Sequence, residues 1–184
     1  TKCPLDKEKK RAPFSLRRRR RGFGRASEYS LQLREKEKVR NFYGLSERQF
    51  QRYFQMAEKK RGIIGEELLL LLERRLDNVI YGLRVVPSRR MVRQIINHGD
   101  ILVNNRRVNR PSYQVRINDV LSFREKSKLY PRLKEMVEKG KKEERLTWLE
   151  FDPEKLSARA VRMPTRADVT VPVTEQLIVD FYSK

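Results

Sequence analysis

Histidine and cysteine, which often carry acid–base and covalent chemistry, are scarce in this chain of 184 residues. His98 is the only histidine and Cys3 the only cysteine, so the chain alone offers neither a histidine-paired nucleophile nor a cluster of the usual metal ligands. No Gly-x-x-x-x-Gly-Lys sequence is present to cradle a phosphate. We therefore expect no enzymatic activity and no cofactor. The carboxylates show no spacing that would pair them, as at Asp77, Asp100, Asp119 and Asp168.

Arginine and amide side chains gather on one predicted helix, which Ser88 can cap and Gly99 can end. At about 100° per residue the helix has an apolar arc and a polar arc. Guanidinium groups suit phosphate oxygens, and amides reach sugars or base edges, so the polar arc predicts an RNA-binding face. The apolar arc holds Met91, Val92, Ile95 and Ile96, and the polar arc holds Arg89, Arg90, Arg93, Gln94, Asn97 and His98.

A short hairpin is predicted directly after this helix. Residues 101–103 and 106–108 flank Asn104 and Asn105, which accept the positive φ of a tight turn. Arg106 and Arg107 then lie just past the hairpin tip, beside the helix. The alternative is an ordinary solvated helix face, and the helix and hairpin together argue against it. For His98, near the helix C-terminus where a cation is favoured, an RNA contact and a structural cap both stay open.

The composition also points to a polyanionic partner. The 44 Lys and Arg against 24 Asp and Glu give a net charge of +20, and the pI is about 10.5. Such a charge repels itself unless nucleic acid or an anionic membrane neutralises it. The longest apolar run, Leu68 to Leu72, is far shorter than the ~18 to 20 residues of a membrane span, and we identify no signal peptide. We therefore expect the partner to be nucleic acid and the protein to lie in a cytoplasm or organelle. The single cysteine is consistent with a reducing compartment.

The first 26 residues form a basic arm, with eleven Lys and Arg against two acids and a net charge of +9. They show no periodic apolar face, so we expect an extended segment that orders on RNA. A nuclear localisation signal at Arg17–Arg21 is the alternative reading of the same run. The arm's candidate RNA contacts are Arg17, Arg18, Arg19, Arg20, Arg21 and Arg25.

Three helices are expected between this arm and the basic helix. The first spans Ser27–Phe42 and is closed by Gly44, and the second starts at Ser46 with a capping box to Gln49. The third opens at Glu66. An aromatic stripe on the second indicates a core seam in preference to base stacking, and it consists of Phe50, Tyr53, Phe54 and Ala57. The buried face of the third carries Leu72, Leu76, Val79, Ile80 and Leu83. The first adds candidate RNA contacts at Tyr29, Arg34, Lys36, Lys38 and Arg40.

The segment after the hairpin is predicted to complete a small sheet. Strand candidates are Tyr113–Val115, Val120–Phe123, Trp148–Phe151 and Arg159–Met163, with a turn at Asn118 and Asp119. One helix is expected from Pro131 to Gly140. A terminal helix begins at Thr174 and carries Leu177, Ile178 and Phe181, an apolar stripe that must return to an earlier element.

These residues resemble the small-subunit ribosomal proteins of the S4 type, whose RNA-binding module also occurs in some pseudouridine synthases and synthetases. The module corresponds to SRRMVRQIINHGDILVNNRRVNRPSYQVRINDVLSF. The resemblance extends beyond it through YSLQLREKEKVRNFYGLSERQF, LLERRLDNVIYGL and the ending VPVTEQLIVDFYSK. That coverage selects the bacterial ribosomal protein among the module's carriers.

The resemblance implies an α+β fold in which a sheet domain is inserted into a helical one. The arm would be 1–26, the helical domain 27–76 completed by 172–184, and the inserted domain 77–171 with its core module at 77–123. It further implies a structural constituent of the small ribosomal subunit that binds the five-prime domain of its RNA early in assembly. Neighbouring ribosomal proteins would contact it, and it would affect decoding accuracy beside the path by which messenger RNA enters. Candidate contacts in the module also include Ser88 and Asn104.

Two other functions are compatible with an RNA-binding module of this kind. A pseudouridine synthase-like enzyme needs a large catalytic domain, for which the residues after Phe123 are too few. A messenger-binding translational repressor would be an additional activity more than a rival. The resemblance also suggests that Cys3 could be the last ligand of a zinc knuckle in a longer form, with no metal in the chain given. The context of Cys3 and the C-terminal ending favour a bacterium over a plastid.

Overall fold

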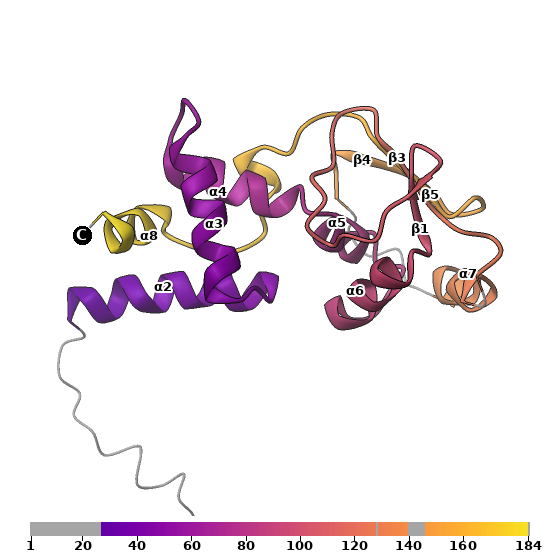
Figure 1. Cartoon of the computed structure of the whole chain (residues 1–184), viewed down its shortest axis with the longest axis horizontal. Helices are drawn as coiled ribbons and strands as arrows, with labels where there is room; N and C mark the ends of the chain where they lie inside the picture. Colours follow the sequence, from indigo (N-terminus) through magenta and orange to yellow (C-terminus); the bar gives the residue numbers. More distant parts are fainter. Residues whose placement is uncertain (1–26, 128, 140–145, 184) are drawn as a thin grey trace, which may run out of the picture.

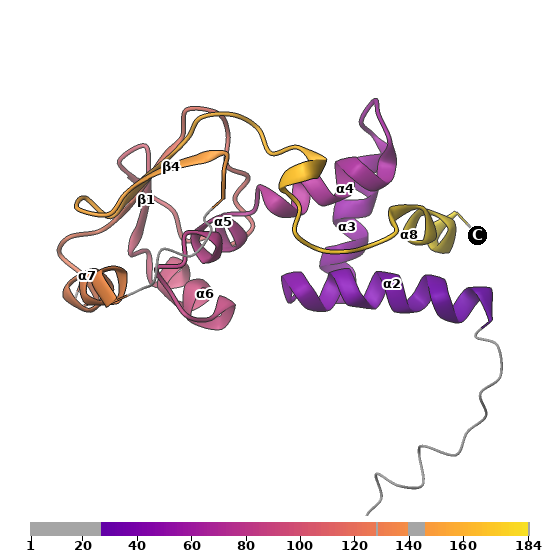
Figure 2. The same cartoon turned by 180° about the vertical axis from the view of Figure 1, so that it is seen from behind.

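The computed structural model describes residues 27–127, 129–139 and 146–183, and these form a helical part beside a part built on a sheet (Figures 1 and 2). The helical part contains α2 (Glu28–Tyr43), α3 (Glu47–Glu58), α4 (Ile64–Glu73) and the terminal α8 (Glu175–Tyr182). The other part contains α5 (Leu76–Gly82), α6 (Arg89–His98) and α7 (Tyr130–Lys139), with strands β1 (Ile101–Val103), β2 (Arg106–Arg107), β3 (Val120–Phe123), β4 (Leu149–Asp152) and β5 (Ser157–Ala160). A short 3₁₀ helix, η3 (Arg166–Asp168), lies on the path back to α8. The α+β class is confirmed.

The ends of α2 and α3 are set by the residues that the sequence indicated. The Ser27 hydroxyl accepts from the amide of Ser30, and Gly44 ends α2 in the left-handed region at φ 61°. Ser46 and Gln49 form the predicted capping box on α3. Each device satisfies backbone groups that a helix end leaves without partners.

The prediction of one continuous third helix is wrong, because the helix is broken into α4 and α5 at Arg74 and Arg75. Four helices therefore precede α6 in the described chain. The break has a tertiary cause. The Leu76 amide donates to the carbonyl of Tyr113 at 2.8 Å and the Asp77 amide to that of Pro111 at 3.1 Å, rather than to the preceding turn. Arg75 is extended there, with ψ at 135°.

The strands form one antiparallel sheet in the order β2-β1-β3-β5-β4. The β1–β2 turn is as predicted, with Asn104 at φ 49° and Asn105 at φ 64°. The strand predicted at 113–115 is not present. The backbone of residues 113–115 instead hydrogen-bonds to the α4–α5 connection, where Gln114 forms an isolated β-bridge with Arg75. The strand predicted at 159–163 begins and ends earlier, at 157–160.

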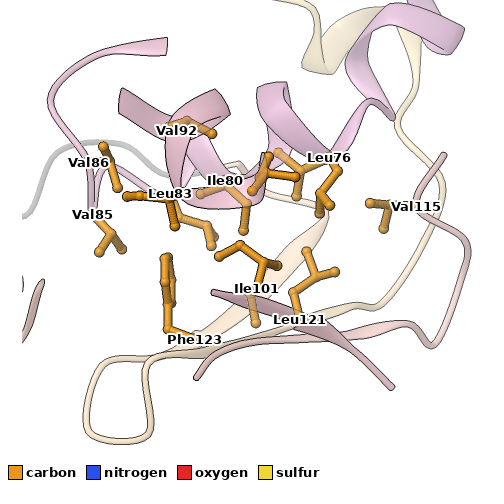
Figure 3. Close-up of a cluster of buried hydrophobic side chains, with 14 of the residues drawn as sticks. Leu76, Ile80, Leu83, Val85, Val86, Val92, Ile101, Val115, Leu121 and Phe123 are labelled. Carbon is orange, nitrogen blue, oxygen red and sulfur yellow. The ribbon is translucent and has the colours of Figure 1, made fainter. Parts of the chain in front are cut away.

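Each part of the molecule contains one hydrophobic cluster. One joins α5 and α6 to the inner face of the sheet, and Figure 3 shows Leu76, Ile80 and Val92 facing Ile101 and Leu121. The other joins α2, α3 and α4 to α8, with Ile178 as the buried anchor of α8. The predicted return of the terminal helix to the first helices is confirmed. The two clusters support the predicted domain division, which stays a proposal.

Candidate RNA-binding surface

Helix α6 presents the two faces that its sequence predicts. Val92, Ile95 and Ile96 are buried against the sheet, and the hydroxyl of Ser88 caps the helix by accepting from the amide of Met91 at 3.3 Å. The hydroxyl of Ser88 therefore has a structural function in this chain. The exposed residues of the polar face are Arg90, Gln94, Asn97 and His98.

The β1–β2 hairpin lies against the C-terminal end of α6. The Arg107 guanidinium donates to the carbonyl of His98. Gly99 is in the left-handed region at φ 72°, and a Cβ there would lie 1.8 Å from Nε of Arg107. A side chain at this position would be strained by the left-handed backbone and would displace the Arg107 guanidinium. Arg106, one residue nearer the hairpin tip, is exposed, so the helix and hairpin form one continuous basic surface.

The side chain of Asn104 is held by the turn that precedes β3 and by the first residue of β3. Its side-chain amide donates to Asp119 at 2.8 Å, and its side-chain oxygen accepts from the amide of Val120 at 2.9 Å. These two bonds join the hairpin tip to the next turn of the sheet. They use one N–H and one lone pair of the exposed carboxamide, and the predicted RNA contact of Asn104 stays a prediction.

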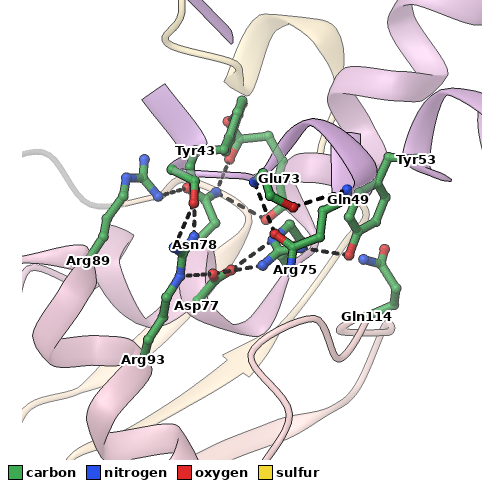
Figure 4. A network of polar contacts seen from close by, with 12 residues as sticks. Tyr43, Gln49, Tyr53, Glu73, Arg75, Asp77, Asn78, Arg89, Arg93 and Gln114 are labelled. Carbon is green, nitrogen blue, oxygen red and sulfur yellow. Dashed lines mark hydrogen bonds and ion pairs between the residues drawn. The ribbon is translucent and has the colours of Figure 1, made fainter. Parts of the chain in front are cut away.

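Arg93 lies at the boundary between the two parts of the molecule (Figure 4). Its Nε donates to Asp77 at 2.8 Å, and its two terminal nitrogens donate to the carbonyls of Gly44 at 2.6 Å and Tyr43 at 2.7 Å. Asp77 is buried and also forms a two-bond ion pair with Arg75, at 2.9 and 2.8 Å. Arg93 therefore belongs to a network that joins α6 to the end of α2.

Arg89 begins a second polar chain across the same boundary. It donates to the side-chain oxygen of Asn78 at 2.6 Å, and Asn78 in turn donates to Glu73 at 2.5 Å. The Tyr43 hydroxyl donates to the other carboxylate oxygen of Glu73 at 2.6 Å. Burial raises the pKa of the Glu73 carboxyl and also that of the Tyr43 hydroxyl. The Arg89 guanidinium lies over the Tyr81 ring, 4.4 Å from its centroid.

The candidate residues on α2 fall into two groups. Tyr29 is 57% exposed, and Arg34 and Lys38 also face solvent. Lys36, only 6% exposed, and Arg40 both donate to Glu47 on α3, at 2.8 and 3.0 Å. The predicted RNA contacts on α2 therefore do not share one environment, because some face solvent and others contact α3.

The cluster around Glu47 makes stability depend on pH. Burial alone would raise the Glu47 pKa, but hydrogen bonds from Lys36, Tyr182 and Arg40 outweigh it and hold the pKa below 4.5. A depressed carboxyl pKa stabilises the fold above the unfolded-state pKa, and this contribution is lost as pH falls through the lower, folded-state pKa. We expect Glu47→Gln to lower the free energy of unfolding by about 0.5–1 kcal/mol at pH 7, since the carboxylate is partly exposed. Urea unfolding from pH 7 to pH 3 should show the deficit shrinking below about pH 4.5. A deficit that is constant with pH would contradict this account.

Helix α3 carries two exposed arginines that were not among the predicted RNA contacts. Arg48 and Arg52, together with Gln51 and Gln55, line a hollow of about 360 Å³. Their spacing of four residues, on the side away from the aromatic stripe, is the signal that could have found them. Burial of Phe50, Tyr53, Phe54 and Ala57 confirms that the stripe itself is core.

The basic arm and Cys3 lie outside the described residues, so the predicted contacts at Arg17, Arg18, Arg19, Arg20, Arg21 and Arg25 stay predictions. Among residues 27–127, 129–139 and 146–183, no group of three His, Cys, Asp or Glu side chains could hold a metal ion. Within the same ranges, no helix is long and apolar enough to cross a membrane.

Comparison with known proteins identifies two family segments. Residues 1–73 match the family described as ribosomal protein S4/S9 N-terminal domain, and residues 74–121 match the S4 domain. The small ribosomal subunit protein uS4 of Acetivibrio thermocellus is 50% identical over 158 residues, covering 86% of this chain and 76% of the relative. The uS4 proteins of Pelotomaculum thermopropionicum and Natranaerobius thermophilus are 46% and 48% identical over 183 residues, covering 100% of this chain and 86% of each relative.

Proposed function

Because this chain belongs to the uS4 family of small ribosomal subunit proteins, we propose that its exposed basic surface binds ribosomal RNA where several RNA helices meet. The protein is a structural constituent of the small subunit. Its family consists of ribosomal structural proteins and not of enzymes. The relatives described above are all named as small ribosomal subunit proteins, and none of these names supports the pseudouridine synthase or repressor alternatives.

The observation that carries the proposal is the continuous surface of α6 and the β1–β2 hairpin. Arg90, Gln94 and Asn97 are exposed on a helix whose other face is fixed in the core, and Arg106 extends the surface onto the hairpin. Cations on rigid elements can neutralise converging phosphates that would otherwise repel one another, and the released counterions add to the affinity. Paired RNA hides its base edges in a deep groove, so backbone and shape should dominate recognition.

We further propose early binding at a junction in the five-prime domain of the small-subunit RNA, which nucleates assembly. The predicted contacts with neighbouring ribosomal proteins, and with messenger RNA where it enters, belong to this proposal. Exposed Arg34 and Lys38 on α2 would extend the RNA surface across the helical part. The cytoplasm of a bacterium is the proposed location, since all the relatives described above are bacterial proteins.

The salt dependence of RNA affinity tests this proposal. A protein that neutralises about 6–10 phosphates loses about 10³–10⁵ in affinity between roughly 50 and 200 mM salt, and we expect a fall in that range. The measurement is filter binding of the full chain to a transcript of the five-prime domain. A transcript of equal length without the junction is the control and should bind more weakly. An almost flat salt dependence would contradict the mechanism, and sedimentation with free messenger but never with small subunits would favour the repressor.

A further inference from the structure

Arg93 differs from the other cations of α6 in how completely it is engaged within the protein. Arg90, three residues earlier, is exposed, whereas three of the five N–H groups of Arg93 have partners at 2.6–2.8 Å. Two of these partners, the carbonyls of Tyr43 and Gly44, lie in the other part of the molecule, 50 and 49 residues away in the chain.

The acceptors at the end of α2 are presented by a specific backbone geometry. Gly44 is in the left-handed region at φ 61°, where it ends α2. A Cβ on Gly44 would lie 3.3 Å from Nη1 of Arg93, closer than an ordinary contact. The carbonyls at a helix C-terminus carry partial negative charge and attract a guanidinium. A side chain at Gly44 would be strained at this φ and would require the guanidinium to shift by a few tenths of an ångström.

The other side of Arg93 is anchored to buried groups. Asp77 accepts from Arg93 and from Arg75, and Arg75 donates to the Tyr53 hydroxyl on α3 at 2.8 Å. The side chains of Asp77 and Arg75 are only 4% and 3% exposed, so their interactions are little screened by solvent. The chain from Tyr53 through Arg75 and Asp77 to Arg93 thus links α3, α5 and α6 to the end of α2 (Figure 4).

We infer that Arg93 is a positioning residue, which holds the basic face of α6 at a fixed orientation to α2 and thereby raises RNA affinity without itself neutralising a phosphate. This inference rests on the proposed function, because it concerns the same RNA surface. If the cations of α2 and α6 must reach phosphates of one junction together, affinity depends on the fraction of molecules in which the two helices are correctly placed. The apparent Kd rises in inverse proportion to that fraction.

The test compares variants of the full chain bound to the five-prime domain transcript at several salt concentrations. Arg93→Ala removes the link, Arg93→Lys keeps the charge but loses the fork, and Gly44→Ala perturbs the same contact without changing any charge. Arg90→Ala is the matched control for loss of one cation from the same helix. Arg75 continues to neutralise Asp77 in the Arg93 variants, so a folded protein is expected, and circular dichroism checks this.

A positioning role predicts that all three link variants lose affinity by about 10–100-fold, as the competent fraction falls to about 10–1%. Their slope of log affinity against log salt should match that of the unmodified chain, whereas Arg90→Ala should flatten the slope by about one contact. Amide residual dipolar couplings should fit one alignment tensor in the unmodified chain and two in Arg93→Ala.

A direct phosphate contact predicts a different pattern, and that pattern would overturn the inference. Arg93→Ala would then flatten the salt slope as Arg90→Ala does, Arg93→Lys would retain most of the affinity, and Gly44→Ala would bind normally. Weak, salt-independent binding by the unmodified chain would instead refute the proposed function. The two failures are therefore distinguishable.

Discussion

Replacing Asp77 by alanine is expected to lower the free energy of unfolding by about 3–5 kcal/mol, because it leaves a buried guanidinium without its counter-charge. The Arg75 side chain is 3% exposed and forms a two-bond ion pair with Asp77, and Arg93 donates to the same carboxylate. Replacing a whole buried ion pair by apolar residues often changes the free energy of unfolding little. Removing only one partner is strongly destabilising, because the remaining charge stays buried without a counter-charge. Urea unfolding followed by far-ultraviolet circular dichroism measures the change.

Two further variants separate the causes of this loss. Asp77→Asn keeps the side-chain shape and should still cost several kcal/mol, because charge and not volume is removed. Glu37→Ala removes a half-exposed carboxylate 3.9 Å from Arg40, and it should change stability by at most about 0.5 kcal/mol. A loss below about 1 kcal/mol for Asp77→Ala would show that Arg75 finds water or another partner, and the network would not be the rigid link described above.

Truncating Ile178 to alanine is expected to cost about 2–5 kcal/mol and to loosen the terminal helix. Ile178 is 1% exposed and is the buried residue of α8 in the cluster formed with α2, α3 and α4. A cavity there cannot close easily, because Gly65 of α4 already lies so near α8 that an added Cβ would be 2.4 Å from Cβ of Glu175. Thermal unfolding gives the stability change, and amide hydrogen exchange shows whether protection is lost first in α8.

The control for this truncation lies on the same helix. Gln176 is exposed and donates to Asp180 within α8, so Gln176→Ala should change stability by about 0.5 kcal/mol or less. Equal effects of the two substitutions would mean that α8 is held by its termini and not by its apolar face. Uniform loss of protection across α2, α3 and α8 would mean that the helical part unfolds as a single unit.

These two predictions concern the same requirement of the proposed function. The proposed RNA surface combines exposed cations of α2 in one part with those of α6 and its hairpin in the other. The Asp77 network holds these parts together, and α8 holds the helical part closed. Loss of either should weaken RNA binding through geometry, with the exposed cations unchanged.

The amino-acid sequence by itself determined the features that depend on near neighbours. Ser88 and Gly99 set the ends of α6, and Asn104 and Asn105 make the hairpin turn, because caps and tight turns are decided by residues a few positions apart. The burial of Val92 and Ile95 followed from helical periodicity for the same reason.

Only the tertiary structure decided which cations of these elements are engaged within the protein and where the chain breaks its helices. Arg90 and Arg93 lie on the same polar arc in a helical projection, yet Arg93 meets carbonyls 49 and 50 residues away. The break between α4 and α5 depends on the carbonyls of Pro111 and Tyr113, which are also remote in sequence. Such partners are brought together by packing, so no local pattern records them. The composition therefore indicates an RNA-binding protein, while the fold determines which arginines remain available to RNA.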